Sequence, residues 1–141
     1  MLFINKVPFI KLNLNPGVFV LDDTSATGKT YLANLMRKYS DNTSVLSVYS
    51  YGDYLKGLDI GYNVTKQTKV LFLDRYDMYY EYEHSEELAN FANSGIIVLM
   101  DCKRVESYPE ECGLATIKLS QEGIEVLVWH TISLKIENMM R

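Results

Sequence analysis

Three short, wholly apolar runs constrain the fold of this chain more than any other feature. Val18–Leu21, Val70–Leu73 and Ile96–Met100 contain apolar residues and nothing else. Runs of this length are typical of strands in parallel sheets whose two faces are both covered by other elements. The segments between the runs are long enough to hold helices. The pattern therefore predicts strands that alternate with helices.

Two of the intervening segments have helical patterns. A helix is predicted to begin near Lys29, because apolar residues recur after it at helical spacing: Leu32, Leu35, Met36 and Tyr39. A second helix is expected over Glu86–Asn93, with Ser85 as its N-cap and Gly95 ending it. Glycines interrupt residues 52–68, where we expect one or two helical turns around Asp53–Lys56 and then loop.

The remaining strands are expected near the two ends of the chain and after the first helix. Phe9–Leu14 alternates apolar and polar residues, Val45–Tyr49 is a further candidate, and residues 15–17 form a turn. Ala115–Leu119 and Ile124–Trp129 flank a four-residue turn in which Gly123 is expected at positive φ. Residues 131–141 fit a strand or a short helix equally well.

Together these elements predict one α/β domain over residues 1–141. The expected architecture has three layers and a mostly parallel sheet of about five strands. Antiparallel strands are added at the N-terminus and by the C-terminal hairpin. A chain of 141 residues buries roughly two-thirds of its unfolded surface, which is enough for a core and one site.

Composition excludes several classes of protein. The chain has 14 Lys+Arg and 18 Asp+Glu, a net charge of −4, so it lacks the basic face of a nucleic-acid-binding protein. No apolar run approaches the roughly 20 residues that span a membrane, and residues 1–6 do not resemble a signal peptide. The two cysteines fit neither a zinc cluster nor a disulfide scaffold. We therefore expect a cytoplasmic protein with no nucleic-acid or membrane partner.

One motif carries chemistry. Residues 23–30, Asp-Thr-Ser-Ala-Thr-Gly-Lys-Thr, match the phosphate-binding pattern G-x-x-x-x-G-K-[ST] except at the first position. Such a loop directs backbone N–H groups at an anion, and the following helix N-terminus adds partial positive charge. Lys29 would bridge the terminal phosphates, and the Thr30 hydroxyl would coordinate Mg²⁺. The expected nucleotide-binding residues are Asp23, Thr24, Ser25, Ala26, Thr27, Gly28, Lys29, Thr30 and Arg75.

A second element lies at the end of the run Val70–Leu73, where Asp74 would hold Mg²⁺ or its waters. With this pairing of motifs the chain resembles the P-loop NTPase superfamily over residues 9 to about 104. Phe9–Leu32 looks like the opening of ATPases of the AAA and ABC kinds. The resemblance implies that the protein binds a nucleoside triphosphate, ATP or GTP, together with Mg²⁺.

The sequence departs from the superfamily pattern in the loop. Asp23 replaces the first glycine, and Thr27 replaces the glycine or serine often found before Gly28. A carboxylate about 6 Å from phosphate, at an effective dielectric near 20, costs on the order of 2–3 kcal/mol. That cost is roughly two decades of affinity. We therefore expect nucleotide binding that is not tight.

The second departure follows Asp74, where Arg75 replaces the glutamate with which many ATPases orient the attacking water. The acids that remain as substitutes are Asp77, Glu81, Glu83 and Asp101. Asp101 is the best placed of them, because the carboxyl ends of strands converge on the ligand crevice. Asp74 and Asp101 are thus the candidate catalytic residues, and hydrolysis is expected to be weak or to depend on a partner.

Two alternatives remain open. Asp74-Arg75-Tyr76 resembles the Asp-Arg-Tyr signature of thymidylate kinases, in which the arginine helps to hold phosphates. This resemblance implies a nucleotide-kinase-like phosphotransferase, although residues 52–68 are too short for a helical acceptor domain. The other alternative is a P-loop fold that has lost its nucleotide chemistry and serves as a protein-interaction module.

Tyrosines are concentrated in one region, with eight between Tyr49 and Tyr82. Such clusters mark interfaces, because tyrosine joins a rigid apolar ring to a polar tip. The region is therefore a candidate surface for a protein partner, although partly buried tyrosines that fill the core explain it equally well. Cys102 lies at a strand end, but no base at a recognisable spacing would activate its thiol.

Overall fold

The computed structural model describes residues 1–22 and 26–130. The expectations for residues 23–25 and 131–141 lie outside this range. Eight strands form one sheet in the order β1-β2-β8-β7-β3-β6-β5-β4. The strands are β1 (Leu2–Ile4), β2 (Phe9–Asn13), β3 (Gly17–Leu21), β4 (Leu46–Tyr49), β5 (Val70–Leu73), β6 (Ile97–Met100), β7 (Gly113–Leu119) and β8 (Gly123–His130). The helices are α1 (Ala26–Ser40), α2 (Tyr51–Leu55) and α3 (His84–Asn93).

The sheet is mixed. Strand β3 is parallel to both of its neighbours, β6 and β7, and β5 is parallel to β6 and β4. The apolar runs at Val18–Leu21 and Val70–Leu73 are thus parallel strands with β6 between them. Strand β2 is parallel to β8, whereas the pairs β1–β2 and β7–β8 are antiparallel.

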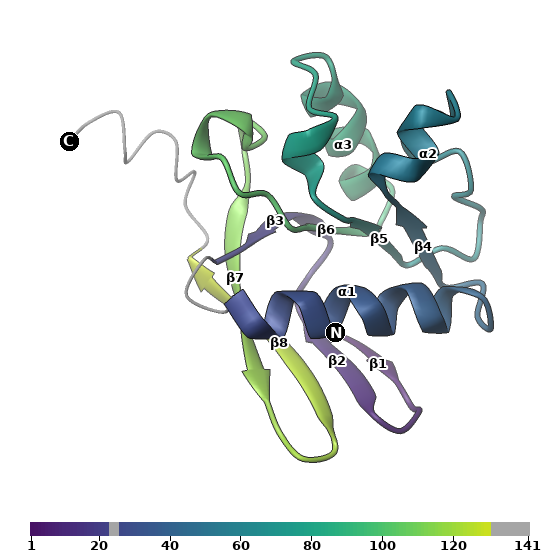
Figure 1. Ribbon diagram of the computed structural model, residues 1–141, viewed down its shortest axis with the longest axis vertical. Helices are drawn as coiled ribbons and strands as arrows, with labels where there is room; N and C mark the ends of the chain where they lie inside the picture. The colour runs from purple at the N-terminus through teal and green to yellow at the C-terminus, as the bar shows by residue number, and fades with distance from the viewer. Residues whose placement is uncertain (23–25, 131–141) are drawn as a thin grey trace.

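The expected fold class is wrong. In place of a three-layer domain with a mostly parallel five-stranded sheet, the chain forms one strongly curled, mixed, eight-stranded half-barrel with few helices (Figure 1). The hairpin β7–β8 does not merely extend an edge, because β2 pairs with β8 in parallel and brings β1 with it. This pairing joins residues 9–13 to residues 123–127, a non-local contact that no local sequence pattern specifies.

One core lies between the sheet and α1. Leu32, Leu35 and Met36 of α1 are buried against side chains from all eight strands. In Figure 1, α1 runs across the sheet, with β3–β6 on one side of it and the turns of the hairpins β1–β2 and β7–β8 on the other. A single amphipathic helix therefore covers this face because the sheet curls around it.

The second core covers the opposite face of β3–β6. Here α3 contributes Leu88, and the connecting loops contribute Tyr76, Tyr79, Ile60 and further buried side chains. Every residue of β5 and β6 is buried, as expected for strands covered on both faces. Loops and tyrosines thus supply much of the cover that helices were expected to provide.

Several local expectations are corrected or confirmed. Strand β1 was not predicted. Helix α3 begins at His84, so Ser85 lies inside it rather than at its N-cap, whereas Gly95 follows its end with φ 101°. Gly123 does not have positive φ. Instead, a Cβ at Gly123 would lie 2.4 Å from the Phe9 carbonyl oxygen, so glycine is required by the close approach of β2 and β8.

No helix in residues 1–22 and 26–130 is long and apolar enough to cross a membrane.

Candidate functional site

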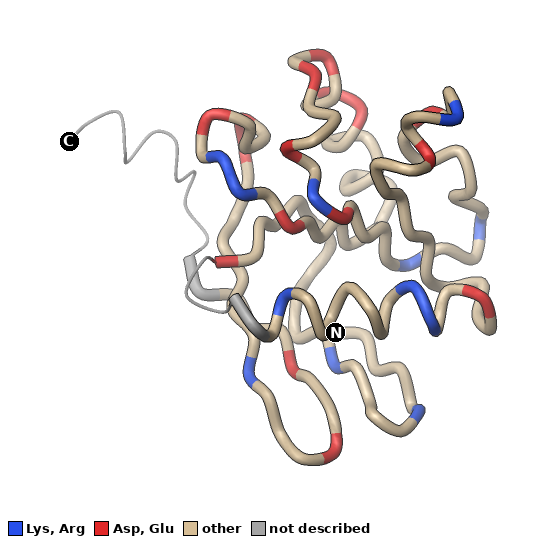
Figure 2. The backbone as a smooth tube through the Cα atoms, viewed as in Figure 1, with Lys and Arg blue, Asp and Glu red and all other residues tan. Residues whose placement is uncertain are grey.

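A cavity of about 270 Å³ lies between α1 and the residues that follow β5 and β6. Charged segments of both signs gather there in Figure 2. The lining residues come from α1 and from the two strand ends: Lys29, Thr30, Ala33, Arg37, Asp74, Arg75, Asp101 and Lys103. The structure thus brings together Lys29, Thr30, Asp74 and Asp101, which the sequence placed in one site.

Helix α1 supplies one face of this cavity through residues at four-residue spacing. Lys29, Ala33 and Arg37 fall on the same side of a helix. The small Ala33 side chain separates the two cations. Arg37 was not predicted as a site residue, although its spacing from Lys29 could have identified it.

Lys29 is buried, with 7% of its surface exposed, and its Nζ lies 3.7 Å from Asp101 Oδ1. Lys29 is therefore not an exposed surface lysine. Asp101 Oδ1 is buried and has no hydrogen-bond partner among the described residues. Burial raises the pKa of Asp101, and Asp74 adds to this effect, whereas Lys29 opposes it. The pair therefore places a cation and an incompletely satisfied acceptor inside the cavity.

Asp74, the expected magnesium ligand, is already engaged. Arg37 Nη1 donates a hydrogen bond to Asp74 Oδ2, and Arg37 Nη2 donates to Asn34 Oδ1 at 2.8 Å. Asp74 follows β5, and its backbone N–H donates to the Tyr49 carbonyl at the end of β4. A cation that binds Asp74 Oδ2 therefore competes with Arg37 for this oxygen.

Arg75 adopts a left-handed conformation, with φ 52° and ψ 56°. Its Nε and Nη2 donate to the two carboxylate oxygens of Asp77 at 3.2 and 3.1 Å. The Lys103 backbone N–H donates to the same carboxylate at 3.1 Å. Burial alone would raise the pKa of Asp77, but these hydrogen bonds and the Arg75 charge lower it below its usual value. Asp77 is thus held by three hydrogen bonds, with Arg75 on both of its oxygens, and is poorly placed to replace the missing glutamate as a water-orienting group.

The phosphate-loop residues are only partly described. Asp23, Thr24 and Ser25 lie outside the described residues, and Ala26 and Thr27 begin α1. Gly28 is also in α1, and a Cβ there would lie 3.0 Å from Ile117 Cγ2 on β7. The packing of α1 against β7 therefore favours glycine at this position independently of any ligand.

The charge of the lining suits an anion. Among the described lining residues, four side chains are cationic (Lys29, Arg37, Arg75 and Lys103) and two are carboxylates (Asp74 and Asp101). Lys103 comes from the loop that follows β6. Guanidinium and ammonium groups are the usual side-chain partners of phosphate.

Both residues that were expected to hold Mg²⁺ lie at this cavity. The exposed Thr30 and the half-buried Asp74 both line the cavity. Within residues 1–22 and 26–130, no group of three or more His, Cys, Asp or Glu side chains is arranged to hold a metal ion. Mg²⁺ that accompanies phosphates needs only one or two protein ligands, so this donor set fits Mg²⁺ bound together with a phosphorylated ligand.

The other singled-out residues divide between core and surface. Tyr49, Tyr76 and Tyr79 are buried, whereas the exposed tyrosines of the region are Tyr51, Tyr54, Tyr62 and Tyr82. His84 is a packing residue whose Nδ1 lies 3.1 Å from the Tyr76 hydroxyl. Burial raises the pKa of the Cys102 thiol to about 12, so this cysteine is not a nucleophile at neutral pH.

Comparison with known proteins gives no relative. No family model matches the chain, and neither a curated protein nor a solved structure is detectably similar to it.

Proposed function

We propose that this protein binds a nucleoside triphosphate, ATP or GTP, together with Mg²⁺, and that it hydrolyses the nucleotide weakly or only with a partner. One observation carries the proposal. The cavity between α1 and the ends of β5 and β6 combines Lys29, Thr30 and Asp74 with further cations from three separate segments. These are the residue types that the P-loop resemblance assigns to phosphate and Mg²⁺, although the fold as a whole differs from the expected one.

Each residue has a distinct role in this proposal. Lys29 and Arg37 would bind phosphate oxygens, with Arg75 and Lys103 adding charge at the cavity rim. Thr30 and Asp74 would hold Mg²⁺, which when bound neutralises charge on the phosphate oxygens. Arg37 and Asp74 form an ion pair with each other. Nucleotide binding would replace this ion pair with a contact from Arg37 to phosphate and a contact from Asp74 to Mg²⁺.

The test is calorimetric titration with ATP and GTP, with and without Mg²⁺. Thr30→Val removes a hydroxyl from an exposed position, and Lys29→Met removes the buried charge. Loss of a charge-assisted contact costs about 1.5–3 kcal/mol, so we expect both variants to bind at least tenfold more weakly.

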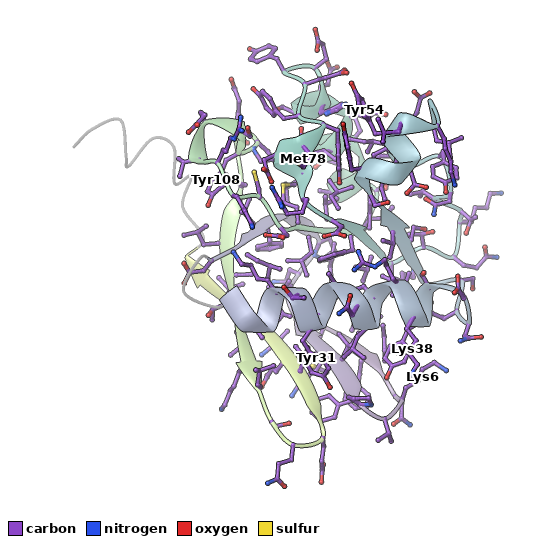
Figure 3. The ribbon with its side chains drawn as sticks, in the orientation of Figure 1. Lys6, Tyr31, Lys38, Tyr54, Met78 and Tyr108 are labelled. Carbon is purple, nitrogen blue, oxygen red and sulfur yellow. The ribbon has the colours of Figure 1, made fainter. Side chains whose placement is uncertain are left out.

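Lys38→Met is the matched control. Lys38 is exposed on the same helix, and its Nζ lies 6.0 Å from the Tyr39 ring, near Lys6 and away from the cavity (Figure 3). Nucleotide affinity in this variant should equal that of the parent. Equal affinity in the Thr30 and Lys29 variants, or no binding by the parent, would refute the proposal.

The phosphotransferase alternative is distinguished from hydrolysis by the product of the reaction. A kinase yields a phosphorylated acceptor, whereas a hydrolase yields inorganic phosphate. The kinase resemblance depends on Arg75. This residue lines the cavity and forms an ion pair with Asp77. A cytoplasmic setting accords with Cys102 and Cys112, two buried cysteines that form no disulfide in the described residues.

A protein partner would bind at the exposed tyrosines. Tyr51 and Tyr54 stack with ring centroids 6.0 Å apart, and Tyr54 stacks on Tyr79 at 6.1 Å. Tyr54 and Met78 lie on the same side of the molecule in Figure 3, and both are exposed. Tyr54→Ser should leave ATP affinity unchanged and abolish any partner-stimulated turnover.

A further inference from the structure

A second and larger cavity, of about 560 Å³, lies along the edge strand β4. Its walls are the C-terminal end of α1, the loop that precedes β4 and the segment 61–65. This volume is within the range of small-molecule sites in proteins. Arg37 lines both cavities, two helical turns or about 12 Å along α1 from Lys29. The second cavity therefore adjoins the candidate phosphate site.

The lining of this cavity consists mainly of uncharged hydrogen-bonding groups. Leu46 and Val48 are apolar, whereas hydroxyl groups come from Ser40, Thr43, Ser44, Ser47, Ser50, Tyr62 and Thr65. Its charged members in the described residues are Arg37, Asp41 and Asp53. The excess of cations that characterises the first cavity is thus absent from the described lining of the second. A phosphate group is favoured in the first cavity and a neutral polar group in the second.

One acceptor of this lining lacks a partner. Asn63 Oδ1 is buried and makes no hydrogen bond to any residue that the structure describes. The amide orientation is fixed, because Asn63 Nδ2 donates to the Val48 carbonyl at 3.4 Å. A buried acceptor without a donor costs free energy, which a ligand hydroxyl group would recover.

A carboxylate is held rigidly beside this amide. Asp53 Oδ2 accepts a hydrogen bond from the Ser50 backbone N–H at 2.9 Å, and Oδ1 accepts one from the Tyr62 hydroxyl at 3.3 Å. The Ser50 hydroxyl also donates to Asp53 Oδ2, at 3.3 Å. An ionised carboxylate accepts about four hydrogen bonds, so Asp53 keeps capacity for one ligand donor. The half-exposed Tyr62 ring adds apolar surface to the same wall.

The free edge of β4 is the competing explanation for this cavity, since an edge strand is a template for pairing with another strand. The segment 61–65 already covers part of that edge. Ser47 Oγ donates to the Asn63 carbonyl at 3.2 Å, and the Val48 carbonyl accepts from the Asn63 amide. Pairing with a further strand would displace both contacts, so a small ligand is favoured over a peptide.

We infer that the cavity bounded by β4, the end of α1 and residues 61–65 binds a neutral, hydroxyl-rich ring of the sugar or cyclitol class. Hydroxyl groups of the ring donate to Asn63 Oδ1 and Asp53, and accept from the serine and threonine hydroxyls. The ring has two sources. It is either a separate sugar or the ribose of a nucleotide whose phosphates lie at Lys29, and only the second source rests on the proposed function.

The test is titration of the full chain, followed by backbone amide NMR shifts, with five separate probes. These are D-ribose, D-glucose, myo-inositol, ATP and inorganic tripolyphosphate. We expect a free ring compound, or ATP but not tripolyphosphate, to shift the amides of residues 44–50 and 61–65. Shifts with a free ring compound assign a separate sugar, and shifts with ATP alone assign the nucleoside part of a nucleotide.

Asn63→Leu removes the unpartnered acceptor at similar volume and should weaken this binding roughly tenfold or more. Asn90→Leu, at an exposed position on α3, is the matched control and should change affinity less than twofold. Ser44→Phe fills the cavity from an exposed position and should also abolish binding, which covers the case in which Asn63→Leu fails to fold.

Absence of shifts at residues 44–50 and 61–65 with every probe would overturn the inference, as would unchanged affinity in both cavity variants. Concentration-dependent shifts confined to β4 would indicate pairing with a second copy and would also overturn it. If the protein binds a free sugar but neither ATP nor tripolyphosphate, the proposed function is refuted and the inference about this cavity stands.

Discussion

Lys29 and Asp101 form a buried ion pair at the point where the proposed ligand would bind. Their Nζ and Oδ1 atoms are 3.7 Å apart, so they attract each other without a hydrogen bond, and Asp101 Oδ1 lacks a hydrogen-bond partner in the described part of the chain. Burial of two charges is costly unless they are well paired. The pair is therefore better suited to receiving a ligand than to stabilising the fold.

Removal of Lys29 should be costly, because it leaves the Asp101 carboxylate buried without this cation. We expect Lys29→Met to lower the free energy of unfolding by on the order of 3 kcal/mol. The double variant Lys29→Met/Asp101→Asn should lose at least about 1 kcal/mol less than the sum of the single variants. Urea denaturation of the four proteins measures this coupling. Strict additivity would show that the two charges do not interact.

Asp77 makes a pH-dependent contribution to the free energy of unfolding. The sign of this contribution follows from the lowered pKa of Asp77. A carboxyl group with a lowered folded-state pKa stabilises the protein above its unfolded pKa, about 3.9, and this contribution is lost as the pH falls through the folded-state value. Asp77→Asn should therefore be less stable than the parent at pH 7, by about 1.5–3 kcal/mol. The difference should shrink as the pH falls below about 4.

Urea midpoints measured from neutral to acidic pH would show this convergence. Asp59→Asn, at an exposed position, is the control and should stay within about 0.5 kcal/mol of the parent at neutral pH. A stability difference for Asp77→Asn that stays constant down to the lowest pH would contradict the assignment.

Among the elements, the junction of β2 and β8 depends on one glycine. A Cβ at Gly123 would meet the Phe9 carbonyl oxygen at 2.4 Å, and a backbone atom cannot move aside without opening the strand pair. We expect Gly123→Ala to destabilise the protein by about 1–3 kcal/mol or more. Gly52→Ala in α2 meets only Ser50 Oγ at 3.7 Å and should stabilise it by up to about 1 kcal/mol. Thermal unfolding of both variants separates a steric clash specific to Gly123 from an effect common to every Gly→Ala substitution.

The sequence predicted the elements better than their assembly. Strands β3, β5 and β6 were identifiable because buried strands are continuously apolar, and α1 because its apolar residues recur at helical spacing. The pairing of β2 with β8 was not predictable, since alternation in Phe9–Asn13 indicates a half-exposed strand without naming its neighbour. Buried tyrosines such as Tyr76 and Tyr79 cover one face of the sheet from loops. The sequence left this role open beside that of a protein interface.

The candidate site shows the same division. Lys29, Thr30, Asp74 and Asp101 were predicted together, because a phosphate-loop motif and two strand-end acids specify one edge of a parallel sheet. The burial of Lys29 and the capture of Asp74 by Arg37 were not predicted. Both depend on distances across the sheet, and a linear pattern does not contain those distances.

At the scale of the whole molecule, the two acids considered for orienting water in the proposed site are both held by cations. Asp77 is held by Arg75 and the Lys103 N–H, and Asp101 lies against Lys29, so neither is placed as a free base for water. We predict ATP turnover by the isolated protein below about 1 s⁻¹, the low end for typical enzymes. Phosphate release should be compared with Lys29→Met, which reports contaminating activity. Turnover well above this limit in the parent alone would contradict the prediction.

The eight strands should also differ in their resistance to opening. Strands β5 and β6 are wholly buried and paired on both sides, whereas β1 has three residues and lies at an edge. Amide hydrogen exchange should therefore be slowest in β5 and β6 and fastest in β1. Uniform protection across the sheet would show that it opens only as one unit.

The parallel pair β2–β8 has a consequence for how the chain acquires this structure. Residues 9–13 are synthesised before residues 14–122, and their partners, residues 123–127, are synthesised only after them. Until then β2 has β1 as its neighbour and an open edge on the other side. Pairings of such long sequence separation slow folding, because the intervening loop must be closed before the contact forms. During translation the sheet is therefore incomplete, and the pairing of β2 with β8 is the step that completes it.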